Sequence, residues 1–433
     1  MLKKAIVPAG LCVLGLCGGA AAADLALLIP NLYGPGGLHV DSEALLPDGS
    51  THSAHFNSSF QQSFTPFNEA LATQLSSVPV PTPASGFTYS FDSSAGVFKR
   101  STQSFGSILS DRAETIGRGK FSFGLNYQRF TFDSIDGVDL GSVPVVFTHD
   151  DPTLSTGRHD VVTTTNLIEA KLDQTVFLAT YGLTDRLDVS AAIPVMHVDL
   201  SATSNATIQR IGTAGSPLTH FFEQPDGTVG TQKTFTSSGS ATGIGDIFLR
   251  LKGTILKQGA TGLALGIEGR IPTGDEMNLL GSGAASVKPF AAFSYSSKTL
   301  SPHVKVGYQW NGKSVLAGDP ATGEKKDLPD IFIYEAGADV ALAKPLTLAF
   351  DLLGRNVING QRLSPETFHA LDGTSTFPNV TFVTQSYNIL NGAVGIKENP
   401  GGNFLLDFNV TFKLNDPGLR DKVTPLVGIE YSF

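Results

Sequence analysis

Charged side chains recur at alternating positions in segments that are otherwise rich in apolar residues. Because buried ions need partners, one interpretation is that paired charges brace a wall of strands from inside. The other is a polar pore lining that selects solutes by charge. Both signs are interspersed, which favours bracing around a narrow or plugged lumen. The residues that we expect to face this lumen are Glu169, Lys171, Asp173, Asp188, Asp246, Arg250, Lys252, Glu268, Arg270, Lys288, Lys305, Glu335, Asp339, Asp351, Arg355, Asp407, Lys413 and Glu430.

Two sequence patterns resemble nucleotide-binding motifs. Residues 307–314 match the phosphate-binding loop, which needs a buried strand before it and a helix after it. Here Tyr308 and Trp310 continue the alternation of a strand, and a polar loop follows. Residues 243–246 carry part of a dinucleotide fingerprint but precede a strand instead of following one. We interpret both patterns as coincidences and predict no cofactor.

Acidic residues gather in one predicted loop, and histidines lie on two predicted strands. The loop could hold Ca²⁺ or bridge lipopolysaccharide through cations, but its spacing is not that of an EF-hand, so we predict a solvated loop and no metal site. Neither His197 nor His303 precedes a serine by two residues, which argues against a nucleophilic enzyme, although pairing across strands stays open. We predict no catalytic residues. The acidic loop residues are Asp133, Asp136, Asp139, Asp150, Asp151 and Asp160.

Twelve segments of barrel-strand length would position these residues. Apolar and polar residues alternate within them, so that one face can meet lipid and the other a wet interior. Their connections alternate between long and short, as expected for extracellular loops and periplasmic turns. We therefore predict an all-β fold, a transmembrane antiparallel up-and-down β-barrel in the bacterial outer membrane. The segments are 120–132, 162–180, 187–204, 244–255, 262–272, 286–298, 302–311, 330–342, 346–357, 382–396, 404–414 and 423–433.

Both ends of the chain fit this interpretation. The last strand ends on Tyr431 and Phe433, a pattern typical of outer-membrane barrels, and we interpret these aromatic residues as the signal for the barrel-assembly machinery. Residues 1–23 have the charged start, short apolar stretch and small residues of a secretory signal, and they contain Cys12 and Cys17. No later apolar run approaches the roughly 20 residues of a spanning helix. The formal charge of -9, without a basic patch, argues against a nucleic-acid partner.

Residues 24–119 do not follow the barrel pattern. A short helix is predicted near 66–76, because Pro66 stands at a position that favours the start of a helix. Residues 87–92 and 96–101 could form a hairpin that is too short to span a bilayer. We assign 24–119 to a periplasmic or plug segment and 120–433 to the barrel. If the hairpin joined the wall, the barrel would have fourteen strands.

Three motifs resemble an outer-membrane family labelled for the meta-pathway of phenol degradation. They are DRAETIGRGKFSFGLNY at 111–127, YGLTDRLDVS at 181–190 and TGIGDI at 242–247, followed by Lys252. The resemblance covers roughly residues 104–433 and implies a transporter-like barrel linked to the uptake of small aromatic or hydrophobic compounds. Barrels that transport long-chain fatty acids and aromatic hydrocarbons are a more distant comparison. They also have an N-terminal plug, but their Asn-Pro-Ala segment is missing here, so their mechanism is not carried over.

The sequence thus predicts a passive outer-membrane channel for small, hydrophobic or aromatic solutes. Its expected partners are outer-membrane lipid, lipopolysaccharide and the solute. The alternative is a non-conducting barrel that serves as a structural or surface-binding protein.

Overall fold

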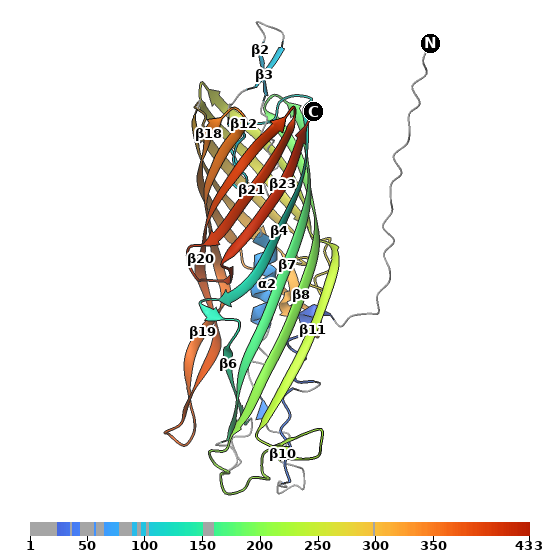
Figure 1. Ribbon diagram of the computed structural model, residues 1–433, viewed down its shortest axis with the longest axis vertical. Helices are drawn as coiled ribbons and strands as arrows, with labels where there is room; N and C mark the ends of the chain where they lie inside the picture. Colours follow the sequence, from blue (N-terminus) through green and yellow to red (C-terminus); the bar gives the residue numbers. More distant parts are fainter. Residues whose placement is uncertain are drawn as a thin grey trace, which may run out of the picture.

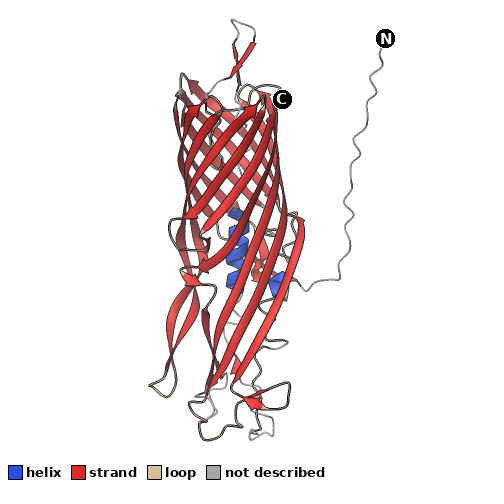
Figure 2. Ribbon diagram, in the orientation of Figure 1, coloured by secondary structure: helices blue, strands red, loops and turns tan. Residues whose placement is uncertain are grey.

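The computed structural model of this chain is dominated by antiparallel strands (Figure 2). It describes residues 24–34, 37–43, 56–57, 65–77, 89–92, 97–100, 104–149, 160–297 and 299–433. The secretory signal predicted at residues 1–23 lies outside the described residues.

Twelve strands form the wall of a barrel, and the last strand returns to the first (Figure 1). β23 pairs with β4 in antiparallel register, with Val427 opposite Tyr127. Closure leaves no sheet edge in lipid, where each unpaired backbone group would cost several kcal/mol. The predicted twelve-stranded antiparallel barrel is confirmed. The wall strands are β4 (Phe121–Ile135), β7 (Val161–Thr184), β8 (Leu187–Gln209), β12 (Ile247–Gln258), β13 (Thr261–Ile271), β14 (Ser286–Tyr295), β15 (Leu300–Asn311), β18 (Ile331–Ala343), β19 (Leu346–His369), β20 (Thr376–Gly401), β21 (Phe404–Lys413) and β23 (Val423–Ser432).

The short turns gather at one end of the barrel, which also holds the carboxy terminus (Figure 1). Only two residues separate β7 from β8, β12 from β13 and β18 from β19, and we take this end as periplasmic. A hairpin of β2 (Tyr89–Asp92) and β3 (Val97–Arg100) projects from it. In the described part of the chain these two strands pair only with each other, so the fourteen-strand alternative is wrong.

Near the periplasmic end, apolar side chains point outward and polar ones inward. On β13, Leu265 is 51% exposed and Glu268 is 7% exposed. On β23, Val427 and Ile429 are exposed while Glu430 is buried. We call this outward-facing surface the apolar belt. Its composition suits contact with lipid acyl chains, and the architecture is that of an outer-membrane β-barrel.

Four wall strands continue far beyond the apolar belt. β7, β8, β19 and β20 have 24, 23, 24 and 26 residues, whereas about 9–11 suffice to cross a bilayer. Their outer halves, together with β6 (Val143–His149) and β11 (Gln232–Ile244), form what we call the extension. Shorter strands accompany it or close loops nearby. They are β5 (Val138–Asp139), β9 (Phe222–Glu223), β10 (Val229–Gly230), β16 (Lys313–Asp319), β17 (Glu324–Asp327) and β22 (Leu419–Asp421).

The extension corrects the long loops that the sequence predicts. The sequence predicts a loop over residues 205–243, yet β11 covers the last part of this segment, ends at Ile244 and pairs with the outer half of β8. Similarly, residues 358–381 are mostly strand, since β19 and β20 remain paired as far as His369 and Thr376. β11 is rich in serine, threonine and glycine and has few apolar residues, so its alternation is weak in the sequence.

The N-terminal elements lie within the barrel and its extension (Figures 1 and 2). They are η1 (Leu25–Leu27), β1 (Phe56–Asn57), which pairs with β6, and α2 (Thr65–Ser77). α2 covers the segment where the sequence predicts a short helix, and Pro66 is its second residue. No described helix is long and apolar enough to cross a membrane.

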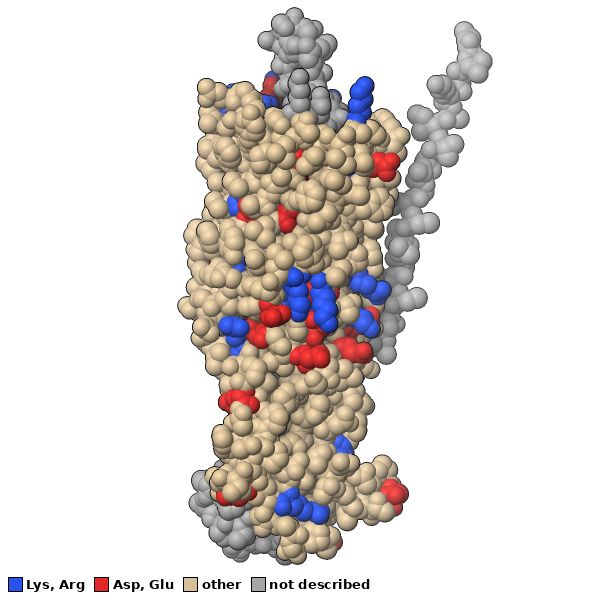
Figure 3. All heavy atoms as spheres, turned by 60° about the vertical axis from the view of Figure 1, so that its left-hand side comes forward, with Lys and Arg blue, Asp and Glu red and all other residues tan. Residues whose placement is uncertain are grey.

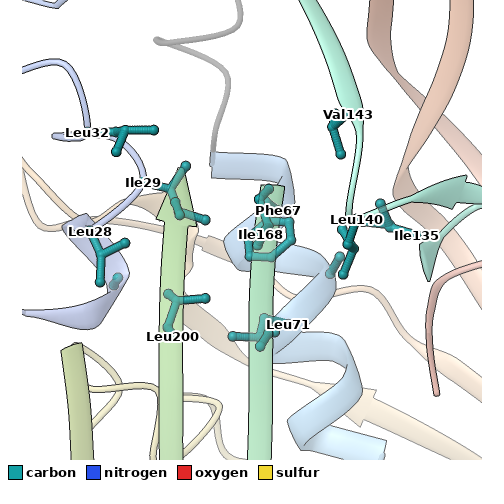
Figure 4. Packing of buried hydrophobic residues seen from close by; sticks show 14 of the residues in the cluster. Leu28, Ile29, Leu32, Phe67, Leu71, Ile135, Leu140, Val143, Ile168 and Leu200 are labelled. Atoms are coloured by element: carbon teal, nitrogen blue, oxygen red, sulfur yellow. The ribbon is translucent and has the colours of Figure 1, made fainter. Parts of the chain in front are cut away.

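The largest apolar core of the described residues fills the interior of the extension (Figure 4). Leu28 and Ile29 from the N-terminal segment and Leu71 from α2 belong to one buried cluster with Ile168 of β7 and Leu200 of β8. In the extension, therefore, the inward faces of the strands are mostly apolar, with a few buried polar residues such as Asn166 and Ser204.

Candidate functional site

A segment that precedes the first wall strand crosses the interior near the periplasmic end. We call residues 104–116 the lumen segment; all of them are buried except Glu114, which is half-buried. The Phe105 N–H donates to Thr347 Oγ1 at 3.0 Å, and the Ile116 N–H donates to Asp188 Oδ2 at 2.9 Å. Since Thr347 and Asp188 are inward-facing residues of β19 and β8, the lumen segment spans the barrel from wall to wall.

Asp111 is the centre of a buried charge network. Its Oδ1 lies 2.7 Å from Arg250 Nη1, and its Oδ2 lies 2.9 Å from Lys305 Nζ. Burial raises the pKa of the Asp111 carboxyl, but the positive charges of Arg250, Lys305 and Lys252 outweigh burial and hold this pKa well below its usual range. Asp111 is therefore ionised and fixes the lumen segment electrostatically.

The wall continues this network around the lumen. Arg250 Nε donates to Glu268 Oε2 at 2.8 Å, and Lys288 forms a second ion pair with Glu268. Lys305 Nζ lies 3.4 Å from Glu335 Oε2. These alternating charges come from neighbouring strands β12 to β18 and pair with one another, as bracing requires.

A second polar cluster holds the next residue of the lumen segment. Arg112 Nη1 lies 3.8 Å from Asp339 Oδ2. His303 Nε2 lies 3.1 Å from Asp351 Oδ1, while its Nδ1 lies 3.9 Å from Asp339 Oδ2. Lys252 Nζ donates to the backbone carbonyls of Arg112 and Glu114 at 3.2 and 2.8 Å. The DRAE motif at 111–114 is therefore held by side chains and by backbone.

Other charged residues on the inward faces pair away from the lumen segment. Lys397 Nζ lies 3.7 Å from Asp407 Oδ1 and from Glu430 Oε2. Asp246 Oδ2 lies 3.7 Å from Arg270 Nε and accepts a hydrogen bond from Ser282 Oγ at 2.7 Å.

Two more of the charged residues expected to face the lumen lie farther from the periplasmic end. Arg355 of β19 is 7% exposed. Lys413 lies 3.6 Å from Asp133 and 3.2 Å from Asp416 at the outer end of β21. Lys413 is thus part of an ion-pair group at the rim of the apolar belt.

The structure contradicts the expected inward orientation of Glu169, Lys171 and Asp173. Their β7 neighbours Ala170 and Leu172 are buried at 4% and 2% exposure, so the charged set points outward. The reason is position along the strand: at this level the interior is filled by the apolar core, and the outside is no longer the apolar belt. Figure 3 shows charges gathered in a band on the outer surface, beside broad surfaces without charge.

The lumen segment is a site that the sequence does not predict. Asp111, Arg112 and Glu114 are three charged residues within four positions, a short distance before the first wall strand, β4. Their charge density was a usable signal, but their partners are more than a hundred residues away in the chain. Tyr431 and Phe433 pack edge to face with ring centroids 4.6 Å apart, and the Phe433 N–H donates to the Phe121 carbonyl at the barrel seam.

The two histidines that the sequence places on predicted strands, His197 and His303, have acidic or hydroxyl partners. His197 faces outward, with Thr242 Oγ1 at 2.6 Å and Asp199 Oδ2 at 3.3 Å. Among the described residues, no group of three or more His, Cys, Asp or Glu is placed to hold a metal ion. Residues 307–314 run from β15 into β16 without an intervening helix, so they lack the geometry of a phosphate-binding loop.

The comparison with protein families agrees with the motifs at 181–190 and 242–247, which lie inside the matched region. Residues 150–352 match the family described by the MetA-pathway of phenol degradation, so the resemblance stated above is confirmed. No curated protein matches the chain. An outer-membrane channel from Pseudomonas putida F1 is 14% identical, with a TM-score of 0.46 over 76% of this chain and 100% of that chain. The toluene transporter TbuX of Ralstonia pickettii is 14% identical, with a TM-score of 0.30 over 73% of this chain and 90% of that chain. The monoaromatic hydrocarbon channel CymD is 11% identical, with a TM-score of 0.35 over 73% and 89%.

Proposed function

We propose that this barrel is an outer-membrane channel through which small hydrophobic or aromatic solutes enter passively. The observation that carries the proposal is the apolar interior of the extension, which adjoins a polar lumen crossed by residues 104–116. The match of residues 150–352 to a family named for phenol degradation supports an aromatic solute. Outer-membrane lipid, lipopolysaccharide and the assembly machinery are the partners that this location implies.

Solute would leave water for the apolar interior of the extension, where Leu200 and Ile168 belong to the wall of the core. Apolar surface removed from water gains about 25 cal/mol per Å², which is the driving force for this step. The lumen segment then stands between the extension and the periplasmic end. Passage requires the N-terminal residues that fill the extension to move aside. It also requires the lumen segment to move, because this segment is anchored to Thr347 of β19 through Phe105 and to Asp188 of β8 through Ile116.

Uptake of labelled phenol by cells with and without the protein tests the proposal. We expect faster uptake with the protein, linear in phenol concentration and unchanged when the proton gradient is dissipated. Equal uptake by both cells would contradict a channel, and saturable, energy-dependent uptake would contradict passive entry.

A second candidate is a non-conducting structural or surface-binding barrel. The buried network around Asp111 favours it, because this network obstructs the lumen. Planar-bilayer recordings separate the candidates. Conductance steps from the wild type, or from a variant with the network broken, support a channel, whereas silence of both supports the second candidate.

A further inference from the structure

A large cavity opens in the wall where β18 begins. β18 pairs with β19 from Ile331, opposite Val357, and β19 continues beyond this point with β20 as its partner. The register of β19 and β20 shifts here, and Asn359 adopts a φ of 54°. The resulting cavity has a volume of about 950 Å³ and is lined by α2, the β16–β17 hairpin and residues of β15, β19 and β20. This volume is within the range of small-molecule sites.

The lining of the cavity is strongly acidic. Five carboxylates face one ammonium group, that of Lys326, which already lies 3.7 Å from Glu324. Asp330 is held in place by the Asn311 N–H at 3.0 Å and the Tyr308 hydroxyl at 3.1 Å. Lining charges of one sign raise the local concentration of counter-ions of the other sign. The carboxylates are those of Glu69, Asp319, Glu324, Asp327 and Asp330.

Glu69 is the buried carboxylate of this set. It belongs to α2, is 8% exposed, and accepts the Gln361 N–H at 3.0 Å. Burial raises the pKa of Glu69 to about 7, and the hydrogen bond from Gln361 opposes this effect only in part. In the described structure its hydrogen-bond donor is a backbone amide, not a cationic side chain. A cation in the cavity would therefore stabilise the ionised form.

Aromatic rings complete the cavity. Trp310 is 53% exposed and packs against Tyr308 with ring centroids 5.1 Å apart, and Phe382 contributes from β20. Indole is the best aromatic partner for a cation placed over its face. A divalent metal ion fits less well, because among described residues no three acidic or imidazole groups converge on one point.

We propose that this cavity binds organic cations that join an ammonium group to an apolar or aromatic body. The cation lies among the carboxylates near Glu69, and the body packs against Trp310 and Phe382. This site goes beyond the channel function proposed above and does not depend on conduction through the barrel.

Binding to the full chain in non-ionic micelles tests the proposal through Trp310, the single tryptophan of the sequence. Benzyltrimethylammonium carries a fixed charge, so any pH dependence of its affinity comes from the protein. We expect a saturable fluorescence change, at least about tenfold weaker binding of benzyl alcohol, and affinity that rises between pH 6 and pH 8. Equal affinity for the neutral alcohol would overturn the proposal.

Glu69→Gln should weaken the binding of benzyltrimethylammonium at pH 8 by about tenfold and abolish the pH dependence, while its amide oxygen still accepts the Gln361 N–H. Glu223→Gln makes the same charge change outside the cavity and should alter neither property. Lys326→Gln should strengthen binding and provides a second variant if Glu69→Gln fails to fold. Wild-type behaviour of both cavity variants would refute the site.

Displacement of the probe by CaCl₂, but not by NaCl of equal ionic strength, would assign the site to divalent ions instead.

Discussion

The periplasmic half of the barrel and the extension share four strands, β7, β8, β19 and β20, but the two regions have opposite polarity. In the first, Leu265 faces out and Glu268 faces in; in the second, Asp173 faces out and Leu172 faces in. The two-residue period is unchanged between them. What changes is the surroundings: lipid outside and a charged lumen in one region, and an apolar core inside the other. The alternation along a strand therefore identifies a polar face and an apolar face. The position along the barrel decides which of the two points inward.

The largest effect on the contrast between the two regions is expected from removing the charge at the centre of the polar lumen. Asp111→Asn leaves Arg250 and Lys305 without their shared carboxylate, and loss of one partner of a buried ion pair costs about 3–5 kcal/mol. We expect the lumen segment to detach and single-channel conductance in planar bilayers to rise above that of the wild type. Unchanged conductance in a folded variant would show that this carboxylate does not hold the segment.

The depressed pKa of Asp111 also predicts how the conductance of the wild type depends on pH. Because this pKa is depressed, the stabilisation is present above the ordinary aspartate value and is lost only as pH falls through the depressed value. Wild-type conductance should therefore be the same at pH 8 and pH 5. A large increase at pH 5 would contradict the assigned electrostatics.

A second test places one cation at two levels on the outward face. Leu265→Arg puts arginine in the apolar belt, where it costs roughly 2–4 kcal/mol at the bilayer midplane. Thr165→Arg puts it on the outward face of the extension, where Thr165 is exposed, and should cost little. Urea unfolding in bilayers measures both, and equal losses would erase the distinction between the two regions.

Glu69 makes the stability of the extension depend on pH. A carboxyl whose folded pKa is raised to about 7 stabilises the fold when protonated and loses that contribution as pH rises from its unfolded value toward 7. With about 1.4 kcal/mol per pKa unit, we expect a loss on the order of 1–3 kcal/mol between pH 5 and pH 8. Hydrogen exchange of the α2 amides measures it, and Glu69→Gln should remove the dependence. Equal protection factors of the α2 amides at both pH values, after correction for the intrinsic pH dependence of exchange, would argue against the assignment.

The smallest effect is expected for an ion pair outside the barrel. Arg129 Nε lies 3.0 Å from Asp173 Oδ1, but the Arg129 side chain is 51% exposed. Exposed pairs contribute about 0–1 kcal/mol, so Asp173→Ala should change urea unfolding by less than Asp111→Asn does. A loss as large as that of Asp111→Asn would mean that the outer surface of the extension is not solvated.

The wall could be predicted from the sequence because its alternation is local. Leu265 and Glu268 are three positions apart, and their opposite orientation follows from strand geometry alone. The orientation of Glu169 could not be obtained this way, because it depends on whether Ile168 meets lipid or the N-terminal core. The chain segment that supplies this core is remote in sequence, and its apolar residues show no barrel period.

The contacts of the lumen segment could not be predicted from the sequence either, because they join residues that are far apart in the chain. The residues of the Asp111–Arg250 pair are 139 positions apart. The DRAE motif and the inward charges of the wall are both evident in the sequence, but no local pattern in the sequence joins them. β11 was missed for a different reason: its serine and threonine residues alternate in polarity too weakly to predict a strand, and it is defined by its pairing with β8.

The position of the lumen segment also sets an order of events during assembly. Residues 104–116 precede every wall strand in the chain, yet their partners extend to Thr347 of β19, 242 positions beyond Phe105. Contacts this distant in sequence form slowly, because a long loop must close before they stabilise anything. The seam between β4 and β23 joins the first and last wall strands, so it cannot form until the whole wall has been made. The lumen segment must therefore either be enclosed when this seam closes or insert into a barrel that has already closed. Breaking the Asp111 contacts would change the rate of the step in which the lumen segment binds the wall, and of no other step.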